Sequence, residues 1–179
     1  TYNGTTIVTG GRLIIDGSNQ GTGLMTIKEN GSLSGKGTIA GDVVVSGSVQ
    51  ADLSASGSCK PLTIKGKLTA NNATLVINME DVTGTIADDT EIKVFNLASA
   101  IQGTGFTDIQ PATPSATQLW DTSLLATKGI IKVVSNVANG ISTPSADNTS
   151  SSAIYDLTGK KTSSPKGLYI KDGKKHIAR

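Results

Sequence analysis

The sequence predicts an all-β fold in which short strands stack as the coils of a β-solenoid. Three observations lead to this prediction. The apolar runs are short, rich in β-branched residues and alternate with polar residues, which is typical of half-buried strands. A motif of glycine, one further residue and an aliphatic residue recurs along the chain. One Trp, three Tyr and two Phe are the only aromatic residues among 179, so we expect a core of thin aliphatic layers.

The repeated motif is clearest in the first 70 residues. Its glycines are Gly11, Gly31, Gly47 and Gly66, which follow one another at spacings of 20, 16 and 19 residues. Glycine lets the backbone turn sharply where a side chain would clash. Parallel strands normally need a crossover connection of about a dozen residues or more, and this spacing leaves no room for one. Coils that stack directly on one another explain the repeat without crossovers.

The repeat weakens after Met79. The sequence predicts a strand at residues 73–79, a polar loop at 80–90, and further strands at 91–95, 118–125 and 128–134. An open solenoid end exposes unpaired backbone groups and invites aggregation. We therefore expect the irregular strands around Trp120 to form a C-terminal cap, which completes a β-helix domain over residues 1–135.

The C-terminal part of the chain differs in composition. Residues 136–152 are rich in Ser, Thr and Asn and predict a polar linker. Residues 153–179 predict a small antiparallel β-hairpin module of two or three strands, at 153–157, 167–171 and 175–178, in which Asp172-Gly173 is the turn between the last two. From residue 151 onward there are seven basic and two acidic residues, against nine basic and twelve acidic before it. This contrast favours two separate modules.

Three stretches, residues 31–43, 62–68 and 119–133, carry a resemblance to a known family. Gly31-Ser32-Leu33-Ser34-Gly35-Lys36-Gly37 opens the first of them. Together they make residues 1–135 similar to the autotransporter-associated β-strand repeat of bacterial autotransporter passengers. The resemblance implies that the β-helix is right-handed and parallel and that the protein is extracellular.

The tail carries a second resemblance, in residues 154–161 and 166–175. The segments Ile154-Tyr155-Asp156-Leu157-Thr158-Gly159 and Gly167-Leu168-Tyr169-Ile170 are similar to a short form of the C-terminal secretion and sorting modules of Bacteroidetes proteins. This implies a protein that is secreted or displayed on the outer-membrane surface. We expect the chain to be a segment of a larger protein, with a neighbouring domain N-terminal to it.

Few residues suggest a binding, metal or catalytic site. Trp120 is a candidate carbohydrate contact, and the alternative is that it anchors the cap. The acidic residues between Glu80 and Glu91 are either calcium ligands or a solvated loop, and their spacing fits no calcium-loop motif. His176 and Cys59 are the only residues of their types, and neither comes with the partners that a catalytic or metal site needs. We therefore predict no catalytic residue, no cofactor and no metal.

The expected function is that of a non-catalytic structural stalk or C-terminal scaffold segment in a secreted or cell-surface bacterial protein. The alternative is an adhesin or a carbohydrate-binding module attached to a polysaccharide-degrading enzyme, with a surface polysaccharide or host glycan as partner. An enzyme of the polysaccharide-lyase type comes last, because only the analogy of fold supports it. A net charge of +2 favours no nucleic-acid partner. No apolar run reaches the roughly 18 residues of a membrane span.

Overall fold

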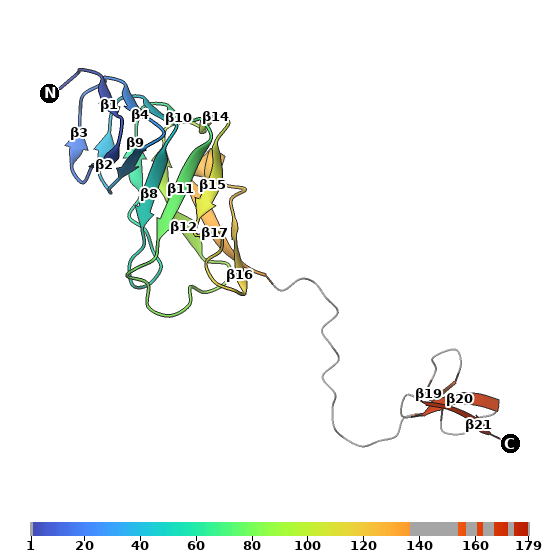
Figure 1. Ribbon diagram of the computed structural model, residues 1–179. Helices are drawn as coiled ribbons and strands as arrows, with labels where there is room; N and C mark the ends of the chain where they lie inside the picture. The colour runs from blue at the N-terminus through green and yellow to red at the C-terminus, as the bar shows by residue number, and fades with distance from the viewer. Residues whose placement is uncertain (1, 137–153, 157–160, 163–166, 172–173, 179) are drawn as a thin grey trace. The chain divides into compact units, whose positions relative to one another are not determined.

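The computed structural model of the protein describes residues 2–136, 154–156, 161–162, 167–171 and 174–178 (Figure 1). The chain divides into two compact units, Thr1–Ala138 and Asn139–Arg179. Apart from its first residue, the predicted linker at 136–152 lies outside the described residues. Among the described residues, no helix is long and apolar enough to cross a membrane.

The larger unit is a parallel β-helix, as the sequence predicts. Each coil passes through three sheets in turn, and each strand then pairs in parallel with its counterpart in the next coil. Sheet A contains β1 (Thr6–Val8), β4 (Met25–Ile27), β7 (Val43–Val45), β10 (Leu68–Ala70) and β14 (Gln102–Gly103). Sheet B contains β2 (Gly11–Ile14), β5 (Gly31–Ser34), β8 (Ser48–Asp52), β11 (Ala73–Asn78) and β15 (Phe106–Gln110). Sheet C contains β3 (Ser18–Asn19), β6 (Thr38–Ile39), β9 (Leu62–Ile64) and β13 (Phe95–Leu97).

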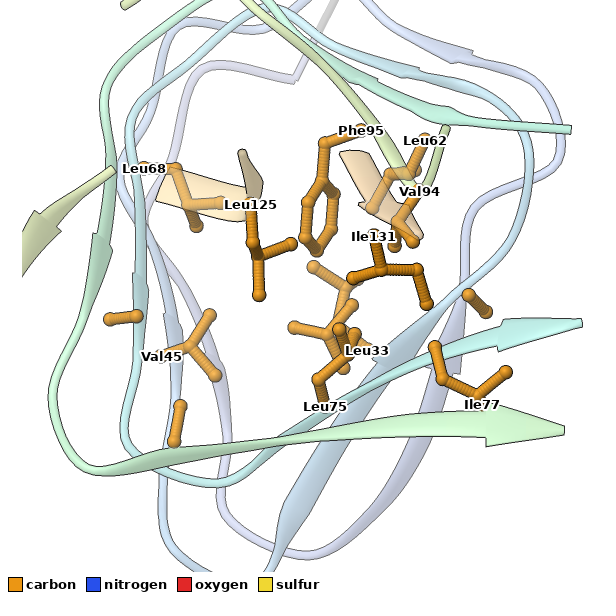
Figure 2. Packing of buried hydrophobic residues seen from close by; sticks show 14 of the residues in the cluster. Leu33, Val45, Leu62, Leu68, Leu75, Ile77, Val94, Phe95, Leu125 and Ile131 are labelled. Carbon is orange, nitrogen blue, oxygen red and sulfur yellow. The ribbon is translucent and has the colours of Figure 1, made fainter. Parts of the chain in front are cut away.

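The register of these sheets stacks like residues on one another. In sheet B, Leu13 pairs with Leu33, and Val49 lies between Leu33 and Leu75. These positions point inward, and in the second, third and fourth coils their side chains are at most 1% exposed. Figure 2 shows the labelled side chains converging from the surrounding strands into one interior. The core consists almost entirely of Val, Ile, Leu and Ala, which confirms the predicted thin aliphatic layers.

Glycines lie at the corners of the coils, where the backbones of successive coils approach closely. A Cβ atom on Gly47 would lie 2.2 Å from the carbonyl oxygen of Gly31, so a side chain there has no space. The structure corrects one part of the predicted repeat. Gly11, Gly31 and Gly47 stack at the start of sheet B, but Gly66 lies against Gly41 at the start of sheet A. The cause is the long loop at residues 53–61, between β8 and β9. It adds residues to this coil, so the fourth motif keeps the spacing of the repeat but falls at the corner before sheet A.

The interior at the C-terminal end is closed by an antiparallel sheet in the order β12 (Glu91–Lys93), β17 (Ile130–Ser135) and β16 (Gln118–Asp121). A single helical turn, α1 (Leu125–Lys128), lies between β16 and β17. Ile131 and Val133 are fully buried, and Leu125 is 5% exposed. The ring of Phe95 stacks on that of Phe106 with centroids 5.7 Å apart. The irregular cap is thus confirmed, whereas the predicted strand at 118–125 ends earlier, at Asp121.

The smaller unit contains an antiparallel sheet in the order β19 (Lys161–Thr162), β18 (Ile154–Asp156), β20 (Gly167–Lys171) and β21 (Lys174–Ala178). Lys171 pairs with Lys174 across the predicted turn. The three predicted strands are present, and β19 is an additional one. Apart from Ile177, which is 75% exposed, the side chains of this unit lie outside the described part of the chain.

Candidate functional site

Trp120 lies on β16 at the edge of the cap, where it pairs with Val133. Its side chain is half-buried and packs against the hydrophobic core. The indole Nε1–H donates a hydrogen bond to the carbonyl oxygen of Pro111 at 3.0 Å. The residue thus has the contacts that an anchor of the cap requires. Its role as a carbohydrate contact stays a prediction.

The acidic residues of the loop between β11 and β12 do not gather at one point. Asp88 accepts a hydrogen bond from Gln118 at 2.6 Å, and Asp89 forms an ion pair with Lys132 at 2.7 Å. The hydrogen bond and charge of Asp89 raise the pKa of Lys132 above its ordinary value. Within the described ranges, no three His, Cys, Asp or Glu side chains are close enough to hold a metal ion. The calcium alternative therefore gains no geometric support here.

Gln118 is a structural residue that the sequence analysis missed. Its side chain is only 4% exposed, and its amide also donates to the carbonyl oxygen of Ile86 at 2.8 Å. It joins the loop before β12 to the start of β16. The sequence does not show whether a glutamine at the start of an apolar strand has a buried or an exposed side chain.

Cys59 is half-buried in the loop after β8, where it forms an isolated antiparallel bridge with Leu53. Burial, and secondly the charge of Asp52, raises the pKa of its thiol to about 11. The thiol is therefore protonated at neutral pH and a poor nucleophile. The side chain of His176 lies outside the described residues.

A groove of about 1030 Å³ runs over the outer face of sheet B. Its floor comes from outward-facing side chains of β2, β5, β8, β11 and β15. Part of its wall is the loop at residues 53–61, which lies beside the following loop at 79–90 in Figure 1. The hydrogen bond from the Thr83 amide to the Ala55 carbonyl, at 3.1 Å, joins these two loops. Trp120 is not among the residues that line the groove, although its partner Pro111 is.

The floor of the groove carries a continuous chain of polar side chains. The Arg12 guanidinium donates to Gln50 at 2.9 Å, and the Gln50 amide donates to Asp52 at 2.7 Å. Asn78 on the next strand donates to the same Asp52 oxygen at 3.0 Å. The bond from Arg12 on β2 to Gln50 on β8 crosses the intervening strand β5, where Ser34 is only 2% exposed. The chain of bonds therefore runs from coil to coil.

The N-terminal face of the solenoid is a second surface with unusual features. The strands β1, β2 and β3 are the edge strands of sheets A, B and C. None of residues 2–20, which include these three strands, is buried. The inward-facing Val8 and Leu13 are only partly buried. Such an unpaired strand edge is a template for further pairing.

The fold defines the protein as a parallel β-solenoid with a small antiparallel C-terminal sheet. No protein-family model, curated protein or solved structure matches the chain. The stacked parallel coils agree with the β-helix that the resemblance to autotransporter repeats implies. Membership of that family remains an expectation.

Proposed function

We propose that the protein is a non-catalytic structural module, which extends a larger secreted or cell-surface protein and carries a neighbouring module on its N-terminal face. The observation that carries this proposal is the contrast between the two ends of the solenoid. Core side chains of the cap are closed off from solvent, whereas each of the three strands of the first coil has one unpaired edge. A module of this kind has one closed end and one end fit for stacking.

The glycines of the first coil support this assignment. Gly17 precedes β3 as Gly37 precedes β6 in the paired strand. A Cβ atom on Gly37 would lie 2.0 Å from the carbonyl oxygen of Gly17, whereas a Cβ atom on Gly17 would meet nothing within 4 Å. The backbone of Gly17 is not in the left-handed region, so its own conformation does not require glycine. Gly17 thus keeps free the space that another coil's backbone would occupy.

The inward-facing residues of the first coil give the same indication. Val8 pairs with Ile27 and Leu13 pairs with Leu33, and both partners are fully buried. Val8 and Leu13 themselves are only half-buried. Full burial of each would contribute about 1 kcal/mol more, half of what a whole aliphatic side chain contributes. A coil stacked on this face would supply that burial.

The extracellular setting belongs to the same proposal. Its support is the similarity of residues 1–135 to autotransporter repeats and of the tail to Bacteroidetes sorting modules. A cell-fractionation experiment with the tagged protein in its source bacterium would test it. Recovery of the protein in the cytoplasmic fraction alone would contradict it.

The stacking face is tested by adding one coil. Duplication of residues 6–24 in tandem adds a coil in register, because Thr6 pairs with Met25. We expect thermal unfolding of the extended chain at a higher temperature and in a single transition. Gly17→Ala in the inner copy should reduce this gain, and the same change in the unextended chain should have little effect. An extended chain of unchanged or lower stability would remove the support for the scaffold role.

A further inference from the structure

We propose that the groove over sheet B binds an uncharged, linear glycan along the axis of the solenoid. This goes beyond the scaffold role proposed above and does not depend on it. Both long loops of the solenoid leave at the same corner, between sheets B and C, after β8 and after β11. In repeat proteins, insertions that gather on one face often mark the binding face. The loop after β8 and the start of the loop after β11 line the groove.

The spacing of the floor suits a linear polymer. Parallel strands of successive coils are about 4.8 Å apart, which is close to the length of one pyranose residue in an extended glycan. Equivalent outward positions of sheet B carry Gln50, Val76 and Gln110 on three successive strands. A sugar chain along the axis would therefore meet a new polar or aliphatic group at each residue.

The chemistry of the floor suits hydroxyl groups. Sugar hydroxyls both donate and accept hydrogen bonds, and the floor offers amide, guanidinium and carboxylate groups side by side. An arginine side chain has five N–H donors, and Arg12 uses only one of its own in a bond to another described residue. The serine hydroxyls at Ser54 and Ser58, which lie 2.7 Å apart, add groups of both kinds on the wall.

The charge of the groove argues against an anionic polymer. The lining contains three basic side chains and four acidic ones: Arg12, Lys36 and Lys60, and Asp16, Asp52, Glu80 and Asp81. The two signs nearly balance, with a small excess of negative charge. A polyanion such as a polyuronate would gain no electrostatic attraction from this surface. None of the lining residues is aromatic, so recognition here rests on hydrogen bonds and on contacts with aliphatic side chains.

The proposed glycan contact lies in the groove and not at Trp120, the residue that the sequence suggests. Trp120 lies outside the lining, and its N–H is bonded to Pro111. Gln50 is at the centre of the polar chain, since it bonds to both Arg12 and Asp52. Gln102 on β14 is an exposed glutamine of another sheet and gives a matched control.

The test is affinity electrophoresis and calorimetry of the full chain with a mixed-linkage β-glucan, a galactomannan and polygalacturonate. We expect binding of at least one of the two neutral polymers and no binding of polygalacturonate. Gln50→Ala should weaken the binding by about fivefold, which is the loss expected for a net hydrogen bond, and Gln102→Ala should leave it unchanged. Circular dichroism would establish that both variants keep their β structure.

Three outcomes would overturn the proposal. The first is that the folded protein binds neither neutral polymer when the polymer is present at millimolar sugar concentration. The second is tighter binding of polygalacturonate than of the neutral polymers. The third is binding that is lost in Trp120→Ala but unchanged in Gln50→Ala, which would place the site on the cap. None of these outcomes bears on the stability of the chain with an added coil.

Discussion

The first and second coils of the solenoid have the same pattern of residues and very different environments. Leu13 and Leu33 are paired members of one ladder, as are Gly11 and Gly31. Leu33 is fully buried, while Leu13 is half-buried. The difference arises because Leu33 has a coil on both sides and Leu13 has a coil on one. In a stacked fold, the contribution of a residue to stability therefore depends on its neighbouring coils as much as on its type.

The largest effect is expected when a buried side chain of the second coil is replaced by a smaller one. Leu33→Ala removes a side chain that is 0% exposed, so the free energy of unfolding should fall by about 3 kcal/mol. Leu13→Ala, its partner in the first coil, should cost about 1 kcal/mol. Urea unfolding followed by circular dichroism would measure both. Equal costs would mean that the first coil is as well covered in solution as the second.

A somewhat smaller effect is expected at the corner glycines. Gly37→Ala places a Cβ atom 2.0 Å from the Gly17 carbonyl oxygen, and the required shift of the backbone should cost about 2 kcal/mol. Gly17→Ala should change the free energy of unfolding by less than about 0.5 kcal/mol. The pair can be compared by thermal unfolding at matched protein concentration. A large loss in Gly17→Ala would show that the N-terminal face is already covered, for instance by a second copy.

The cap offers a test at the other end of the solenoid. Gln118→Ala removes the bonds to Ile86 and Asp88 and leaves a buried carbonyl unpaired, at a cost of about 1–2 kcal/mol. Gln102→Ala, an exposed glutamine on β14, should cost almost nothing. Hydrogen exchange should show faster opening of β16 and β17 in the Gln118 variant alone. Unchanged exchange there would mean that the loop and the cap are held together by other contacts.

The last expected effect is absent at neutral pH and consists of a pH dependence from Cys59 in alkaline solution. Its pKa is about 11 in the folded chain, against 9.0 for an ordinary thiol. Between these values the unfolded chain loses the proton and the folded chain keeps it, so this residue lowers stability as pH rises from 9 to 11 and contributes nothing below 9. Cys59→Ser should lose that component. Urea midpoints of both proteins at pH 8 and pH 10.5 would measure it, and parallel pH profiles would contradict it.

Much of the fold could be predicted because solenoid coils are specified locally. The alternation in runs such as Val43-Val44-Val45 marks one inward face, and the corner glycines mark the turns. The register of the fourth motif could not be predicted, because the loop before Leu62 hides the change of corner. The helical turn at Leu125–Lys128 was missed because its apolar residue resembles the end of a strand. Leu125 packs into the core from a helical turn, in which apolar and polar residues do not alternate.

The candidate site was much less accessible from the sequence. Its polar chain joins Arg12, Gln50 and Asn78, which are far apart in the sequence and come together only because four coils stack. Single polar residues in strands look like ordinary solvent-facing positions. Trp120 was conspicuous because of its rarity, while the residues that form the groove have common side chains.

The corner between sheets B and C has a consequence for how such a protein can evolve. Both long loops leave the solenoid there, yet β9 still pairs with β6, and β13 still pairs with β9, in unbroken register. Residues can therefore be added or lost at this corner without disturbing the strands on either side. The molecule separates a part that must repeat from a part that is free to vary, so new surfaces can arise beside an unchanged framework.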